Sequence, residues 1–271
     1  MDYWADSTDV FPTVDIKGGV AVIYRDAKQS FGKIGTFTAY KELTSIANKV
    51  YYKLGTLDEI IYAQNRFNLE VLYTDYPELK ATVGSNGGER RLTTSIFSLH
   101  LIFFEEQPKE DNYKILGLVN GERCYRWIKR KYIEPHLNLD KYKVIVPKSN
   151  GSGAIGEVLS TPLIGEPLIG EPLIGVTQTF ITIGAFDTRA EAEACLKYVK
   201  TKFTRTMLGI LKATQDNPKD TWRLVPLQDF TAESDIDWTQ SVAEIDRQLY
   251  RKYGLDEKEI AFIEEKVRAM E

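Results

Sequence analysis

The residues of this chain best suited to bind a ligand lie in the stretch 142–156, Tyr-Lys-Val-Ile-Val-Pro-Lys-Ser-Asn-Gly-Ser-Gly-Ala-Ile-Gly. The run Val144 to Val146 predicts a buried strand, which three glycines follow. Such a loop lets backbone N–H groups approach an anion, because glycine has no Cβ and adopts positive φ easily. Further donors are the side chains of Lys148, Ser149, Asn150 and Ser152. We interpret the loop as facing a nucleic-acid backbone, with Gly151 and Gly153 allowing close approach.

The distribution of charge favours this interpretation, although the net charge of −4 does not. Residues 120–150 hold eight Lys/Arg against three Asp/Glu, a balance of +5. Residues 195–223 hold seven Lys/Arg against two Asp/Glu, again a balance of +5. Residues 227–271 hold six Lys/Arg against twelve Asp/Glu, a balance of −6. A basic middle with an acidic end is typical of a polyanion-binding surface. Solvated faces of ordinary helices and strands would give the same pattern.

Two basic segments supply further candidates. In the stretch Arg123-Cys-Tyr-Arg-Trp-Ile-Lys-Arg-Lys-Tyr132, cations alternate with aromatic residues, which suits phosphate contact and base stacking. It equally suits an amphipathic element with its aromatic residues in a core. We expect Arg126, Lys129 and Arg130 to hold phosphates with the glycine loop. Arg90 and Arg91 end a flexible loop, and we assign them to base edges because arginine pairs bidentately with guanine.

The rest of the pattern predicts a mixed α/β fold, large enough for one large or two ordinary domains. Expected strands are a hairpin across 9–25 turning at Lys17-Gly18-Gly19, then 98–104, 113–119 before the turn Asn120-Gly121, 177–183 and 222–230. Expected helices are 43–54, 56–65, 187–212 and two in the last forty residues. In the helix 187–212, we expect Lys197, Lys200 and Arg205 to lie away from the apolar face.

A five-residue unit is written three times after the glycine loop, at Pro162, Pro167 and Pro172, each followed by Leu-Ile-Gly. Proline at every fifth position excludes a helix and a central strand, since proline lacks the backbone donor that both need. The three copies are too short for a solenoid. The pattern indicates a chain of turns or an expanded loop.

Cysteine and histidine usage argues against a metal or redox centre. Cys124 and Cys195 have neither a metal-ligand nor a redox spacing, and His100 and His136 are the only histidines. Cys195 lies on the apolar face of an expected helix, which indicates a buried thiol in a reducing compartment. The start has no signal-peptide pattern, and no run approaches the length of a membrane span. We therefore expect a cytoplasmic protein that does not enter a membrane.

Several segments together resemble the adenine-specific DNA methyltransferases of type II restriction–modification systems. The run Val10-Phe-Pro-Thr-Val-Asp-Ile-Lys-Gly-Gly-Val20 resembles the closing strands of their catalytic domain. From the basic strand and glycine loop to Val225-Pro-Leu-Gln-Asp229, the chain resembles their TaqI-like target-recognition domain. The ending Leu249-Tyr-Arg-Lys-Tyr-Gly-Leu-Asp-Glu-Lys-Glu-Ile-Ala-Phe-Ile-Glu264 is similar to the ending common in those enzymes.

The resemblance implies a remnant of the catalytic-domain sheet with helices over 1–70, a DNA-specificity domain over 71–230 and a two-helix tail over 231–271. Its partners would be duplex DNA and the missing methyltransferase or nuclease half. The parent activity would be site-specific adenine-N6 methylation or restriction cleavage, with S-adenosylmethionine and Mg²⁺ as cofactors. The glycine-rich cofactor loop and the Asn-Pro-Pro-Tyr tetrapeptide are both missing from this sequence. We therefore expect no cofactor and no DNA methylation by this chain alone.

Other functions remain open from the residues. A metal-dependent restriction nuclease could use Asp9 with Asp15 and Lys17, although their separation is short. A nucleotide site at 149–156 lacks the spacing of a phosphate-binding loop, since Lys148 precedes the glycines. The acidic tail could instead dock a partner, with no DNA binding by the chain itself. The edge of the expected hairpin at 9–25 would favour self-association, so we also expect a homodimer.

Overall fold

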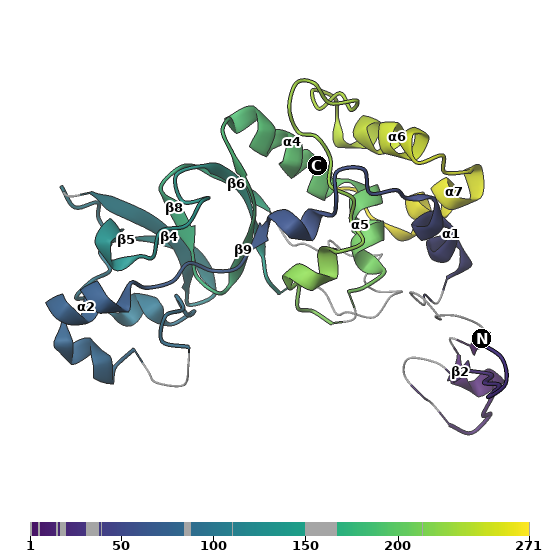
Figure 1. Cartoon of the computed structure of the whole chain (residues 1–271), viewed down its shortest axis with the longest axis horizontal. Helices are drawn as coiled ribbons and strands as arrows, with labels where there is room; N and C mark the ends of the chain where they lie inside the picture. The colour runs from purple at the N-terminus through teal and green to yellow at the C-terminus, as the bar shows by residue number, and fades with distance from the viewer. Residues whose placement is uncertain are drawn as a thin grey trace.

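The computed structural model describes residues 2–4, 6–14, 16, 20–30, 38, 40–83, 88–109, 111–149, 167–212 and 214–270. The predicted mixed α/β class is confirmed (Figure 1). The described helices are α1 Lys41–Lys49, α2 Leu69–Asp75, α4 Arg189–Lys200, α5 Lys202–Gly209, α6 Val242–Lys252 and α7 Glu257–Lys266. The described strands are β1 Asp2–Trp4, β2 Val20–Val22, β3 Ile61–Tyr62, β4 Asn112–Val119, β5 Glu122–Lys129, β6 Tyr142–Pro147, β7 Leu168–Gly170, β8 Ile174–Val176 and β9 Phe180–Phe186.

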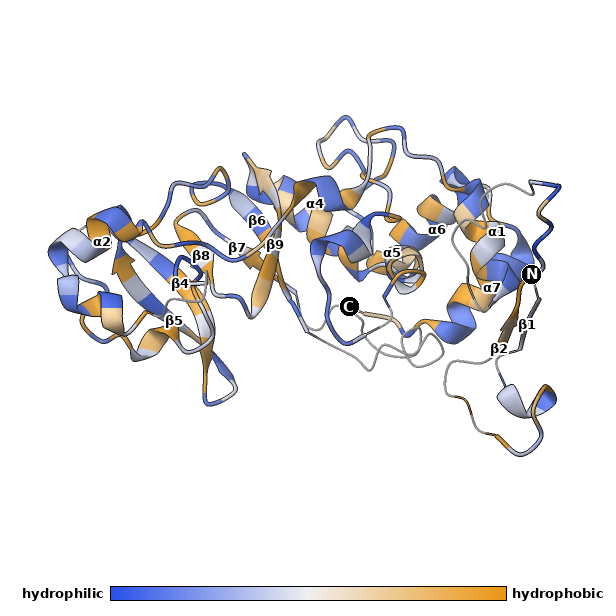
Figure 2. Cartoon of the chain, turned by 60° about the horizontal axis from the view of Figure 1, so that its bottom comes forward, coloured by the Kyte–Doolittle hydropathy of each residue, from blue (hydrophilic) through white to orange (hydrophobic). Residues whose placement is uncertain are grey.

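Two sheets form the centre of the molecule. One has the strand order β3-β9-β6-β7, with antiparallel neighbours. The other has the order β5-β4-β8, in which β4 and β5 are antiparallel and β4 and β8 parallel. In Figure 1 α2 lies beyond the three-stranded sheet, and α4 to α7 lie on the far side of the four-stranded sheet. The strand β9 is largely hydrophobic (Figure 2), because both of its faces are covered.

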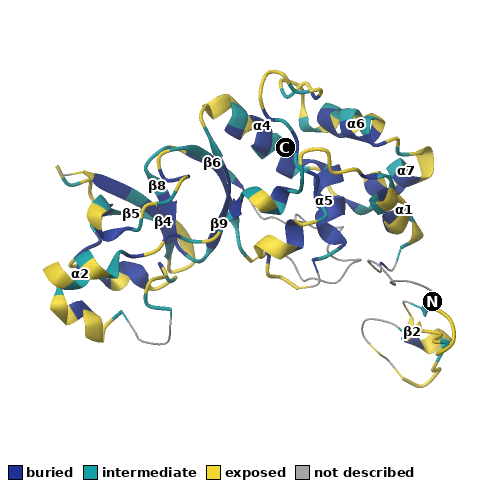
Figure 3. Cartoon of the chain, viewed as in Figure 1, coloured by how far each residue is buried: buried dark blue, intermediate teal, exposed yellow. Residues whose placement is uncertain are grey.

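Three buried clusters follow from this layering (Figure 3). The helical core lies between the four-stranded sheet and the helices and includes Leu43, Ile183, Tyr198, Leu249 and Ile263. The outer core, between the three-stranded sheet and α2, includes Phe67, Leu72, Phe97, Ile115 and Ile128. The inter-sheet core joins the two sheets through Leu116, Ile145, Val176 and Phe180.

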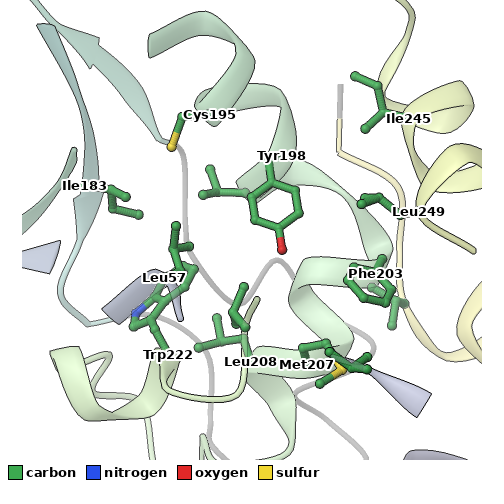
Figure 4. Close-up of a cluster of buried hydrophobic side chains, with 14 of the residues drawn as sticks. Leu57, Ile183, Cys195, Tyr198, Phe203, Met207, Leu208, Trp222, Ile245 and Leu249 are labelled. Carbon is green, nitrogen blue, oxygen red and sulfur yellow. The ribbon is translucent and has the colours of Figure 1, made fainter. Parts of the chain in front are cut away.

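The helical core draws on distant parts of the sequence (Figure 4). Tyr198 is fully buried and donates its hydroxyl hydrogen to the carbonyl oxygen of Pro226 at 2.6 Å. The Phe203 ring stacks on that of Tyr253, with centroids 4.9 Å apart. Cys195 is buried here, and burial raises the pKa of its thiol above the usual range, so the predicted buried thiol is confirmed. The two predicted C-terminal helices, α6 and α7, are confirmed and belong to this same core.

The helix expected over 187–212 is two helices, because Thr201 breaks it. Thr201 has ψ of 148°, and its hydroxyl accepts a hydrogen bond from the Thr204 N–H at 3.1 Å, which caps the start of α5. The expectation that Arg205 lies away from the apolar face is wrong. Arg205 is fully buried, and its guanidinium donates to the carbonyl oxygens of Lys200 and Arg268. The bend turns this side chain toward the C-terminal segment.

Two described copies of the Pro-Leu-Ile-Gly unit form edge strands of different sheets. The copy after Pro167 is β7, which pairs with β6, and the copy after Pro172 leads into β8, which pairs with β4. Both strands lie at an edge of their sheets, and Pro167 and Pro172 precede the strands, so neither proline removes a ladder hydrogen bond. Leu173 between them has φ of +69° and reverses the chain. The repeat therefore links the two sheets, and the first copy lies outside the described residues.

Four further expected elements differ from the structure. The hairpin across 9–25 is wrong in its first strand, since β2 pairs with residues 2–4 and the Ser7 hydroxyl accepts the N–H of Ile16 at 2.7 Å. Residues 57–60 form one 3-10 turn, although the Thr56 capping box is present, because β3 follows and pairs with β9. The segment 98–104, expected as a strand, begins in a 3-10 turn and continues in turns. Residues 219–222, at the start of the strand expected over 222–230, also form a 3-10 turn. Lys17, Gly18 and Gly19 lie outside the described residues.

Candidate nucleic-acid interface

A polar groove of about 610 Å³ opens where β6 ends and the β4–β5 hairpin turns. Among the described residues that line it, Arg123 and Lys148 are cationic and Asp216 is acidic. The remaining described lining residues are Thr94, Leu118, Gly121, Pro147, Ser149, Gln178, Thr179 and Phe180. The groove thus joins the end of the four-stranded sheet to the hairpin of the three-stranded sheet.

The turn of the hairpin places Arg123 at the groove. Asn120 and Gly121 have φ of 52° and 83°, the left-handed conformations that a tight hairpin turn needs, so the predicted turn is confirmed. Arg123 pairs with Leu118 across the hairpin, and its guanidinium lies over the Phe180 ring at 5.7 Å from the centroid. Phe180 starts β9. A cation–π contact therefore connects the two sheets at this point.

The backbone of Lys148 is held from two sides. Its N–H donates to the carbonyl oxygen of Thr179 at 2.9 Å, and its carbonyl oxygen accepts the N–H of Asn217 at 2.6 Å. Ser149 then forms a bridge with Asp216. These contacts fix the point at which the glycine-rich stretch leaves β6, with Lys148 half-buried and Ser149 exposed. The predicted donors at 148 and 149 therefore lie on a rigid support.

Hydroxyl and amide groups of Thr94, Gln178 and Thr179 also line the groove, and Thr179 is the direct backbone partner of Lys148. Gln178 is fixed by its N–H, which donates to the carbonyl oxygen of Leu92 at 2.7 Å. Its side-chain amide donates to the Thr94 hydroxyl at 3.4 Å, and the Thr94 and Thr179 hydroxyls are also 3.4 Å apart. Groups of this kind can hydrogen-bond to base edges as well as to phosphates.

Other predicted phosphate ligands are engaged in ion pairs elsewhere. Arg126 pairs with Glu105 at 2.6 Å and lies over the Phe97 ring, on the face of the hairpin opposite Arg123. Arg130 pairs with Asp111 at 2.7 Å and lies over the Tyr113 ring. Lys129 ends β5. None of these three is among the described residues that line the groove.

The predicted base readers lie on a separate segment. Arg90 pairs with Glu134 at 2.9 Å, and its side chain is 63% exposed. Arg91 forms a backbone bridge with Arg66. The structure therefore brings Lys148 and Ser149 together with groups other than Arg90 and Arg91. Asn150, Gly151, Ser152 and Gly153 lie outside the described residues.

Sequence reasoning missed Arg123, Gln178 and Thr179 as members of the groove. Arg123 belongs to the alternating basic stretch 123–132. Side chains alternate between the two faces of a strand, so Arg123 and Arg126, three positions apart, point to opposite faces. This alternation could have separated Arg123 from Arg126. Gln178 lies in the short polar turn Thr177–Thr179 between β8 and β9. The strand pairing that brings this turn beside Lys148 has no local sequence signal.

The second basic stretch, 195–223, stabilises the fold. Lys197 donates to three carbonyl oxygens, those of Trp238, Thr239 and Gln240, at 2.7 to 3.2 Å. Lys202 pairs with Glu264, and Lys212 donates to the carbonyl oxygen of Thr214 at 3.0 Å. These three lysines and the buried Arg205 are thus held by contacts within the protein. The positive balance of 195–223 therefore gives little support to a polyanion surface.

The residues proposed for a nuclease are only partly described. Asp9 lies in a 3-10 turn, while Asp15 and Lys17 lie outside the described residues. Among the described residues, no group of three or more His, Cys, Asp or Glu side chains could hold a metal ion. No described helix has the length and apolar character that a membrane crossing requires.

Comparison with known protein families finds no family model that matches this chain. Comparison with curated proteins finds no similar sequence.

Proposed function

We propose that this chain binds duplex DNA through the groove at the end of β6 and presents it to a catalytic module of a restriction–modification enzyme. The observation that carries the proposal is that Lys148 and Ser149 share one groove with Arg123 and Gln178. A groove that contains two cations and several neutral hydrogen-bonding groups suits a phosphate backbone and the adjacent base edges. The resemblance to target-recognition domains supports the choice of duplex DNA.

The groove residues divide into two roles under this proposal. Lys148 and Ser149 contact phosphates, because they lie where the glycine-rich stretch leaves the sheet. Arg123 and Gln178 contact base edges, since arginine pairs with guanine and glutamine pairs with adenine in the major groove. Asp216, whose backbone pairs with that of Ser149, adds a negative charge that opposes phosphate binding in the groove. Phosphate contacts give affinity for any duplex, and base contacts give sequence preference.

The proposal is tested by the fluorescence anisotropy of labelled random-sequence duplex DNA across a salt series. Wild-type binding should weaken steeply with salt, because each phosphate contact releases counterions. Lys148→Ala should lower the slope of log affinity against log salt by about one unit. The matched control is Lys258→Ala, which removes an exposed lysine of α7. An unchanged slope in Lys148→Ala, or equal effects of both variants, would contradict the proposal.

A further inference from the structure

The face of the β4–β5 hairpin that packs in the inter-sheet core through Leu116, Leu118 and Tyr125 continues beyond that core to Trp127. Trp127 on β5 pairs with Phe104, and each donates its N–H to the carbonyl oxygen of the other at 2.9 Å. Directly opposed residues of antiparallel strands share a face. Both side chains are partly exposed, and neither belongs to the three described hydrophobic clusters. Two partly exposed aromatic side chains therefore lie on this face outside the described hydrophobic clusters.

Strand alternation extends this face along β5. Arg123 and Tyr125 precede Trp127 at intervals of two residues, so all three side chains point to the same face of the sheet. Lys114 on β4 pairs with Trp127. Its ammonium lies 4.4 Å from the centroid of the Tyr125 ring and 5.4 Å from that of Trp127. The aromatic face, defined as Phe104, Lys114, Tyr125 and Trp127, therefore has a cation held among its rings.

The combination of rings and cations on a sheet has a specific chemical complement. Unpaired bases stack on aromatic side chains, and neighbouring cations hold the phosphates of the same strand. Paired bases within a duplex are stacked on one another and do not present their ring faces. Arg123 lines the groove at the other end of this face, and Leu116 and Tyr125 of the inter-sheet core lie between Arg123 and Trp127. The charge and the rings together fit a single strand.

We propose that the aromatic face binds unpaired nucleotides, with bases stacking on Phe104 and Trp127 and with Lys114 contacting a phosphate. This is a site for single-stranded nucleic acid and goes beyond the duplex binding proposed for the groove. The shared chemistry is the unpaired nucleotide, which DNA or RNA could supply.

The test measures binding of labelled oligo(dT) and oligo(U) to the full chain by anisotropy, together with tryptophan fluorescence. Trp127→Ala should weaken oligonucleotide binding by about 5- to 150-fold, the range expected for the loss of one stacked base. Trp127→Phe should retain binding but lose the quenching of fluorescence that stacking on the indole causes. Tyr24→Ala, which removes an aromatic residue that is 72% exposed elsewhere, is the matched control and should change neither.

The outcomes separate this proposal from duplex binding. Lys148→Ala should weaken duplex binding and leave oligo(dT) binding unchanged, whereas Trp127→Ala should do the reverse. Tighter binding of oligo(U) than of oligo(dT) would assign RNA as the source, and the opposite order would assign DNA. Absence of binding to both oligonucleotides would overturn the proposal. So would fluorescence quenching that persists in Trp127→Phe, a result that holds even if Trp127→Ala does not fold.

Discussion

Lys143 lies in β6 and Lys148 directly follows it, but the fold places their ammonium groups in different environments. Lys148 reaches the groove, where an anion can approach its ammonium. Lys143 is 1% exposed, and its ammonium donates to the carbonyl oxygens of Leu139 and Ile174 at 3.3 and 2.8 Å. Burial lowers the pKa of Lys143 to about 7, because the charged form loses its hydration. Two lysines of one basic stretch therefore differ in whether their charge faces solvent.

Lys143 should make the stability of the protein depend on pH. Its pKa is lower in the folded than in the unfolded state, so the unfolded state binds more protons between about pH 7 and pH 10.4. The free energy of unfolding contributed by Lys143 therefore rises with pH in that window, by at most about 1.4 kcal/mol per pH unit. Urea denaturation across this range should show that Lys143→Met removes the rise. Lys258→Met, at an exposed position, should keep it. The same pH dependence in Lys143→Met and wild type would show that Lys143 stays charged in the fold.

At the scale of elements, local signals predicted where chain segments turn and begin. The turn at Asn120-Gly121, the strand before the glycine loop and the two C-terminal helices are present as expected. The capping box at Thr56 starts only one turn, because pairing of β3 with β9 outweighs the local preference. The bend at Thr201 was missed since hydrophobic periodicity continues through it.

Only those residues of the candidate site that lie next to the predicted strand and loop could be predicted from the sequence. Lys148 and Ser149 follow directly from the strand and the loop, and the structure places both at a groove. Arg123 and Gln178 reach the same groove through β4–β5 pairing and through the β8–β9 turn. Pairing between distant strands has no signature in a single sequence, so these partners could not be assigned. Ion pairs such as Arg126 with Glu105 were unpredictable for the same reason.

The repeat units should depend on their glycines. A Cβ on Gly175 would lie 2.7 Å from Asn65 Oδ1 and 2.7 Å from Ile115 Cδ1, and that Asn65 oxygen accepts the N–H of Val176. Gly175→Ala should therefore lower the free energy of unfolding by about 1–3 kcal/mol, as overpacking does. Urea denaturation measures the change. Gly88→Ala, where a Cβ meets open space, is the control, and equal stability of both variants would contradict this packing.

At the scale of the whole molecule, distant segments share one core. Leu43 and Ile46 of α1 pack in the helical core together with Ile245, Leu249 and Ile263 of the last two helices. Lys49 also pairs with Glu259 at 2.6 Å across this interface. The C-terminal helices are thus joined to the body of the protein by burial and by charge. The domain boundaries expected at 70/71 and 230/231 remain predictions.

Removal of residues 231–271 should unfold the helical part of the chain. The truncation would expose Leu43 and Ile46, which are fully buried, and leave α4 and α5 without their cover. We expect the truncated chain to lose helical circular dichroism beyond the share of α6 and α7 and to lose its cooperative melting transition. A truncated chain that melts cooperatively with the remaining helices intact would show that the tail is an independent unit.

The central claim is that duplex DNA lies in the groove between the end of β6 and the β4–β5 hairpin. Its most direct test is ultraviolet crosslinking of the full chain to a duplex pool that contains 5-iodouracil, followed by mass spectrometry of the crosslinked peptides. We predict crosslinks in the peptides that contain Arg123, Lys148 or Gln178. Crosslinks confined to α6 and α7, or none at low salt, would contradict the claim.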